Sequence, residues 1–248
     1  EQKIATLVDA QAGAFAGELE TAVRIDSATE NLAGVRRLAE HFAGQLDALG
    51  FTSRFVGLPA SAGRAGHLVA ERKGTKGKRV LLIGHLDTVY PGGDFRREGD
   101  TVHGSGVNDM KGGDIVMLTT LRALHAAGAL ADTQIIVVMT GDEEAVGNPQ
   151  EVARRDLFEA ARRSEVALSF ESSIGRTGTV ARRGSISWAL EVQGVTGHSS
   201  GIFSAAMGHG AIFETARILQ GFYDQLRSLD GLTISPALVA AGVEAELS

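Results

Sequence analysis

Residues 84–88 place two side chains with metal chemistry two positions apart, His85 and Asp87. An imidazole nitrogen is a common zinc ligand in proteins. Side chains at i and i+2 of an extended segment point to the same side, so the Asp87 carboxylate can accept the second ring N–H and fix the tautomer. A His-x-Asp tripeptide alone is a weak motif, because an ordinary loop often contains the same letters.

A further acid, Asp109, stands in the glycine-rich stretch GSGVNDMKGG of residues 104–113. This stretch does not match the phosphate-binding pattern GxxxxGK[ST], and a carboxylate at the entrance of the following helix would repel a phosphate. A carboxylate shared by two metal ions suits the position, and the glycines permit an unusual backbone beside it. Capping the helix is the alternative role, and Asp109 can fill both roles.

Two more acidic segments each follow an apolar stretch of strand length. The run Asp-Glu-Glu at 142–144 comes directly after residues 134–140, and Glu171 closes residues 166–170. Successive acids repel one another unless a cation or a shared proton offsets their charge. A solvated acidic loop gives the same letters, so this run alone does not decide between the two interpretations.

The patterning of apolar residues predicts a scaffold that brings these groups together. Helical spacing occurs at residues 32–49, 112–127 and 152–162, and strand-like runs occur at 51–56, 67–71, 80–84, 134–140 and 166–170. Strands that alternate with helices indicate an α/β fold, here a three-layer domain with a mostly parallel sheet. The loops after the carboxyl ends of such strands form the ligand crevice, so we expect the acids and His85 to converge there.

The pattern changes near residue 178. Residues 178–183 and 185–192 predict an antiparallel pair of strands, residues 209–226 an amphipathic helix, and residues 232–240 a further strand. We therefore predict two domains, an α/β domain at residues 1–177 and a partial α+β domain at residues 178–248.

The order His-x-Asp, glycine-rich Asp, Glu-Glu and strand-end Glu is far more specific than any of its members. In this order, and in the stretches LLIGHLDTVYP, GSGVNDMKGG, VVMTGDEE, VALSFESS and GHSSGIF, the sequence resembles the M20 metallopeptidases, a family that includes glutamate carboxypeptidase, aminoacylases and several di- and tripeptidases. The resemblance implies a zinc-exopeptidase-like catalytic domain at residues 1–177 and a lid or dimerisation domain beyond it.

The resemblance also implies a site for two zinc ions. His85, Asp109 and Glu171 would hold one ion, and Asp109 would bridge to a second ion held also by Glu144. Members of the family complete the second site with a histidine near the C-terminal end of the catalytic domain. The last histidine here is His209, inside the predicted lid helix, so we expect this sequence to be part of a longer chain.

Catalytic roles follow from the same resemblance. Glu143 would be the general base that acts on water, and Asp87 would orient His85. A cis peptide bond is expected directly after Asp109. His198 would bind substrate and stabilise the oxyanion, commonly in the active site of a partner subunit, which implies a homodimer formed through the lid.

Composition argues against several other classes of protein. The net charge of −6 is interspersed, with neither a basic stripe for nucleic acid nor a basic amphipathic helix for a membrane surface. No apolar run approaches the length of a membrane span. The absence of cysteine excludes disulfides, thiolate metal sites and a cysteine nucleophile. The compartment stays open between the periplasm and the cytoplasm.

The sequence therefore predicts a zinc-dependent hydrolase that cleaves an amide bond. A carboxypeptidase-type exopeptidase that releases a C-terminal amino acid is the first choice, because Glu at the position of Glu171 is typical of carboxypeptidases in the family. An N-acyl-amino-acid deacylase would use the same chemistry, so the expected substrate is a peptide or an N-acyl amino acid. A catalytically inactive M20-like binding module is the alternative of another class. The absent histidine favours that module, and the retained Glu143 and Glu144 argue against it.

Overall fold

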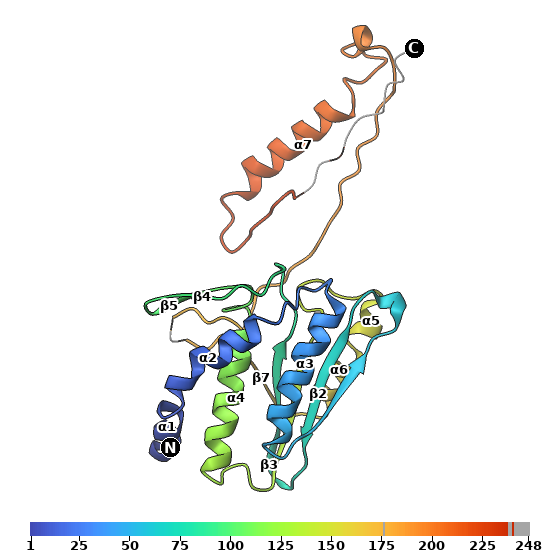
Figure 1. Cartoon of the computed structure of the whole chain (residues 1–248). Coiled ribbons are helices and arrows are strands. Elements are labelled where there is room, and N and C mark those ends of the chain that lie inside the picture. Colours follow the sequence, from blue (N-terminus) through green and yellow to red (C-terminus); the bar gives the residue numbers. More distant parts are fainter. Residues whose placement is uncertain (176, 238–239, 241–248) are drawn as a thin grey trace. The chain divides into compact units, whose positions relative to one another are not determined.

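The central sheet has five strands in the order β1-β2-β6-β3-β7. In a computed structural model that describes residues 1–175, 177–237 and 240, the chain divides into two units, Glu1–Thr179 and Val180–Ser248. The sheet belongs to the first unit (Figure 1). Its strands are β1 (Thr52–Gly57), β2 (Gly66–Arg72), β3 (Lys76–His85), β6 (Thr133–Thr140) and β7 (Val166–Ser169).

Two of the four strand pairings are antiparallel, so the sheet is mixed and the prediction of a mostly parallel sheet is confirmed only in part. β3 pairs in parallel with β6 and with β7, whereas β2 pairs antiparallel with both β1 and β6. The short connection between β1 and β2 contains no crossover helix, and a connection of that kind joins antiparallel strands. Four strands still share one direction, so β3, β6 and β7 end at the same edge of the sheet.

Helices cover both faces of the sheet, which confirms the three-layer α/β class. One face carries α2 (Ala12–Val23), α3 (Leu32–Asp47) and α4 (Lys111–Ala126), with α1 (Gln2–Asp9) beside α4. The other carries α6 (Arg155–Arg162), preceded by the short helix α5 (Gln150–Ala153).

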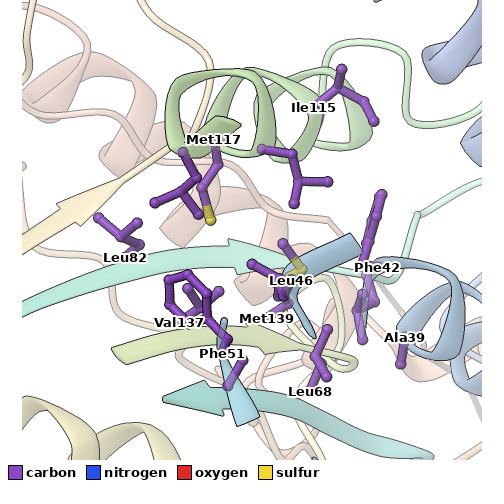
Figure 2. Close-up of a cluster of buried hydrophobic side chains, with 14 of the residues drawn as sticks. Ala39, Phe42, Leu46, Phe51, Leu68, Leu82, Ile115, Met117, Val137 and Met139 are labelled. Atoms are coloured by element: carbon purple, nitrogen blue, oxygen red, sulfur yellow. The ribbon is translucent and has the colours of Figure 1, made fainter. Parts of the chain in front are cut away.

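Alternating side chains of the strands build the two apolar layers. In β6, Val137 and Met139 join the larger core under α3 and α4 (Figure 2), and Ile136 and Val138 join the smaller core with Ala160 of α6. Successive residues of a strand point to opposite faces, so a strand covered on both sides is apolar throughout. This is why the uninterrupted apolar runs of the sequence correctly predict these buried strands.

The helix predicted at residues 32–49 forms as α3, Leu32–Asp47. The Asn31 side chain caps its first turn by accepting the Gly34 N–H at 3.0 Å, which satisfies a backbone donor that the helix itself cannot. Val35, Leu38 and Phe42 recur on one side and are fully buried. The cap and the apolar stripe together fix where this helix starts and which face meets the sheet.

Several elements of the first unit were not predicted. The helices α1 and α2 precede the first predicted helix, and the strands β4 (Arg96–Glu98) and β5 (Thr101–His103) form a small antiparallel ribbon. The ribbon strands are too short and too polar to show an alternating apolar pattern.

The second unit contains α7 (Ala211–Leu226) and the 3₁₀ turn Ser199–Gly201, and its described residues include no strand. The predicted antiparallel pair at 178–183 and 185–192 is therefore wrong, and so is the start of the predicted strand at 232–240, of which residues 238 and 239 lie outside the described part. Here Trp188 packs edge-to-face on Phe222 of α7, with ring centroids 5.6 Å apart, without a backbone ladder.

The helix α7 begins two residues later than predicted. His209 and Gly210 both have positive φ, 65° and 80°, so the chain turns sharply before the helix starts. Across the described residues, every helix is too short or too polar to cross a bilayer.

Candidate metal centre

His85 ends β3 and is almost fully buried. Its ring N–H at Nδ1 donates to the Asp87 carbonyl oxygen at 2.9 Å, whereas the Asp87 carboxylate lies 3.6 Å away. The backbone of Asp87 therefore fixes the tautomer, although its side chain was expected to do so. With the proton on Nδ1, the lone pair of Nε2 is available for a metal ion.

Two carboxylates approach His85 Nε2 from separate loops. Asp109 Oδ1 lies 2.9 Å from Nε2 and Glu171 Oε1 lies 3.8 Å from it. Donor atoms of these three residues all lie within 4.8 Å of one another. The structure thus brings together the three residues expected to hold the first zinc ion.

Close packing between α4 and the end of β7 brings Asp109 near Glu171. A Cβ on Gly113 would lie 2.0 Å from the Phe170 carbonyl oxygen, so only glycine permits this approach. The N–H of Phe170 donates to Ile83 in β3 at 3.1 Å, which places the next residue beside the end of β3. The peptide bond between Asp109 and Met110 is cis, as expected.

Glu143 and Glu144 reach His85 from the loop after β6. Donor atoms of these two glutamates and of His85 also lie within 4.8 Å of one another. The N–H of Leu86 donates to the Thr140 carbonyl at 2.7 Å, so the chain after β3 runs beside the chain after β6. This parallel register explains why segments more than fifty residues apart meet.

The carboxylate of Asp87 contacts the backbone of the acidic loop. Oδ1 accepts the N–H of Glu143 at 2.9 Å, and Oδ2 accepts the N–H of Glu144 at 3.1 Å and the Thr29 hydroxyl at 2.8 Å. Asp87 is fully buried, and all three bonds are to groups that donate. The sequence did not reveal this contact, because it depends on the register between β3 and β6.

Like charges at this site perturb its titrating groups. Burial, opposed by His85 and reinforced by Asp109 and Glu143, raises the pKa of Glu144. Burial alone would lower the pKa of His85, but Asp87, Glu171 and the hydrogen bond to Asp109 raise it instead. A cation bound here would offset the same repulsion between the acids.

The donor set fits divalent metal ions such as zinc. It offers one imidazole nitrogen and the carboxylate oxygens of Asp109, Glu143, Glu144 and Glu171, which are ligand types that zinc accepts. The chain has no thiol that could compete. The concentration of acids around one buried imidazole is best offset by a cation, so the residues present fit the expected group.

Two buried ionisable residues of α4 lie behind the centre and were missed from the sequence. Lys111 Nζ donates to the Ile25 carbonyl at 2.9 Å, and burial lowers its pKa to about 8 although Asp26 and Asp114 oppose this. Burial raises the pKa of Asp114 well above its ordinary value, and neither carboxyl oxygen has a hydrogen-bond partner among the described residues. The sequence signal for Asp114 was its position directly before Ile115, on the apolar face of the helix.

His198 belongs to the second unit, where it caps the 3₁₀ turn Ser199–Gly201. Its Nδ1 accepts the N–H of Ser200 at 3.2 Å and lies 2.9 Å from the Ser200 hydroxyl. Its expected role at an oxyanion stays a prediction.

Comparison with known proteins adds a family assignment. The model of the peptidase family M20/M25/M40 matches residues 81–219, more than half of the chain. Carboxypeptidase G2 of Pseudomonas sp. (strain RS-16) is 36% identical over 162 residues, which are 62% of this chain and 37% of that protein. The succinyl-diaminopimelate desuccinylase of Novosphingobium aromaticivorans is 34% identical over 168 residues, 62% of this chain and 44% of that enzyme.

Solved structures show the same fold at low sequence identity. Human carnosine dipeptidase 1 superposes with a TM-score of 0.55 at 18% identity, over 68% of this chain and 40% of that one. Aminopeptidase PepT from Bacillus cereus gives 0.52 at 19% identity, over 64% and 43% of the two chains. This chain therefore spans less than half the length of these four similar proteins.

Proposed function

The chain belongs to the peptidase family M20/M25/M40, and from this premise we propose that it carries most of the catalytic centre of a dinuclear zinc hydrolase that cleaves amide bonds. One observation carries the proposal. The donor atoms of His85 fall within 4.8 Å of two separate pairs of carboxylates, Asp109 with Glu171 and Glu143 with Glu144. Nε2 of the one imidazole can bind only a single ion, so the further carboxylates gathered around it leave oxygen donors for a second, neighbouring ion.

In this proposal His85, Asp109 and Glu171 would hold one ion, and Asp109 and Glu144 would contribute ligands to the second. When bound, the ions would polarise the scissile carbonyl and lower the pKa of a water molecule toward about 7. Glu143 takes the proton from the attacking water and passes it to the leaving amine. The exposed position of Glu143 supports this role, because a general base must reach solvent and substrate.

Asp87 holds the backbone of the base in place. By accepting the N–H groups of Glu143 and Glu144, its carboxylate fixes the start of both side chains while its own carbonyl orients His85. Positioning of this kind lowers the entropy that must be lost when the reacting groups align. We also propose that His198 donates a hydrogen bond to the oxyanion. A homodimer formed through residues 178–248 is part of the same proposal.

The specific activity we propose is that of a carboxypeptidase. The similarity to carboxypeptidase G2 and the glutamate at position 171 support it. N-acyl-amino-acid deacylation is the second candidate, supported by the similarity to succinyl-diaminopimelate desuccinylases. Both reactions leave a free amine and a carboxylate, and they differ in what flanks the scissile amide.

Assays of the zinc-loaded full-length protein on peptides and on N-acyl amino acids test the proposal. Release of a C-terminal amino acid from a peptide supports the carboxypeptidase, and hydrolysis of the acyl substrates alone supports the deacylase. Cleavage of neither, together with less than one zinc ion bound per chain, would leave the M20-like binding module as the function.

A further inference from the structure

A buried polar network lies behind the acidic loop of residues 141–147, and no role assigned so far uses it. The fully buried carboxylate of Asp142 forms an ion pair with the Arg154 guanidinium, and it accepts the N–H of Gly147 at 2.9 Å. A second guanidinium nitrogen donates to the Asp142 carbonyl at 3.1 Å. A single arginine, at the junction of α5 and α6, thus binds both the side chain and the backbone of Asp142.

His67 of β2 holds the same loop at the preceding residue. Its Nδ1 accepts the N–H of Gly141 at 3.2 Å, so its proton is on Nε2, which donates to the Ala153 carbonyl at 2.7 Å. The imidazole is fully buried and links the loop to the residue before Arg154. Gly141 has no room for a side chain, because an added Cβ would lie 2.3 Å from the Gly66 carbonyl oxygen.

This network contacts a loop whose acidic side chains are repelled by neighbouring acids. Glu143 and Glu144 share the neighbourhood of His85 with Asp109 and Glu171, and the negative charges of Asp109 and Glu143 act on Glu144. Asp87 holds the two backbone amides from the metal side. Asp142, directly before them, is held by a different set of groups, the Arg154 guanidinium and the N–H of Gly147. A buried ion pair adds little net stability, so fixing a geometry explains it better than strengthening the fold.

We propose that Asp142 and Arg154 are positioning residues that hold the Glu143–Glu144 pair at the metal centre against the repulsion of the neighbouring acids. The inference rests on the proposed function for the nature of the bound ions and deepens it, because it assigns residues that support the loop without contacting the ions. Arg154 acts only through Asp142 and the loop backbone, and it contacts neither metal nor substrate.

The test compares Arg154→Met with the control Arg163→Met in the full-length protein. Arg163 forms an ion pair with Glu71 at 2.7 Å, outside the loop, so its loss removes a similar side chain without touching Asp142. We expect Arg154→Met to lower kcat and the affinity for cobalt(II) by about 10–100-fold, with KM almost unchanged. The visible spectrum of bound cobalt should change as well. Arg154→Lys keeps a cation beside Asp142 and should restore part of each loss, and the control should match the parent.

Equal cobalt affinity, spectrum and kcat in Arg154→Met and the control would overturn the inference. It would also be overturned if Arg154→Lys folded but recovered nothing. If Arg154→Met does not fold, Asp142→Asn takes its place, because it is isosteric and keeps an acceptor for Gly147. If the parent neither binds cobalt nor hydrolyses any substrate, the proposed function fails. In that case, hydrogen exchange at the backbone amides of Glu143 and Glu144 tests the inference. Faster exchange in Arg154→Met than in the parent supports the inference, and an unchanged exchange rate overturns it.

Discussion

At the scale of single residues, the centre consists of one buried imidazole that faces carboxylates from three loops. Burial, with Asp109 and Glu143, raises the pKa of Glu144, and at His85 the nearby acids outweigh burial and raise the pKa of the imidazole. Residue types and positions singled out His85, Glu143, Glu144 and Glu171 beside strand ends and Asp109 in a glycine-rich stretch, and the structure brings these residues around one imidazole. They could not reveal that Asp87 binds the amides of the acidic loop, since this contact follows from strand register.

Glu143→Gln should lower kcat by about 10²–10⁴-fold, the usual contribution of a general base, while the bound zinc stays constant. The glutamine keeps the size of the side chain but cannot accept the proton of water. Steady-state kinetics and metal analysis measure both effects, with Glu151→Gln on the exposed side of α5 as the control. Loss of zinc from Glu143→Gln with turnover retained by Glu144→Gln would show that the two roles are exchanged.

Asp114→Asn should stabilise the metal-free protein increasingly as pH rises above about 4. Burial raises the pKa of Asp114 in the folded state, so the unfolded chain loses this proton first and rising pH lowers the free energy of unfolding by up to about 1.4 kcal/mol per pH unit. An asparagine at position 114 loses no proton. Urea unfolding of both proteins between pH 4 and 7, with chelator present, measures the difference. A difference that stays constant or shrinks with pH would contradict a raised pKa.

At the scale of elements, the residues of the site lie at the ends of three strands and at the N-terminus of α4. The apolar runs at 80–84, 134–140 and 166–170 predicted β3, β6 and β7 within a few residues, because strands covered on both faces are apolar throughout. The order in the sheet could not be predicted from these runs. β6 lies between β2 and β3 although it follows both in the chain.

Gly141→Ala should destabilise the protein by about 1–3 kcal/mol and weaken metal binding, because the new methyl group would meet Gly66 and Val35. The matched control is Gly44→Ala in α3, where nothing lies within 4 Å of an added Cβ. That change should stabilise the helix by about 0.5–1 kcal/mol. Chemical unfolding and a zinc titration measure both variants. Equal stability of the two would contradict the close approach of β2 and the acidic loop.

At the scale of the whole molecule, sequence patterning was informative for the first unit and poor for the second. Beyond residue 178 only the helix was predicted well, because α7 has its own apolar stripe while the extended segments form no ladder among the described residues. Alternating letters cannot tell a strand from an extended segment whose side chains, like Trp188, rest on a helix.

Zinc should stabilise the whole protein by offsetting the repulsion at the centre. A ligand at about 100 times its Kd adds about 2.7 kcal/mol to the free energy of unfolding, so Tm should rise with zinc and fall with a chelator. Asp109→Asn should lose most of this rise, and Asp100→Asn in the exposed turn between β4 and β5 should keep it. Calorimetry measures Tm for each protein. An equal zinc-dependent rise in the Tm of both variants would show that zinc binds elsewhere.

Anomalous diffraction at the zinc edge from crystals of the full-length protein tests the central claim most directly. The account predicts two peaks that share Asp109. One should lie about 2.0–2.2 Å from His85 Nε2 and within the same reach of a Glu171 oxygen, and the other within that distance of Glu144. Zinc-loaded crystals with no peak beside His85 Nε2, or with a single peak that excludes Asp109, would contradict it.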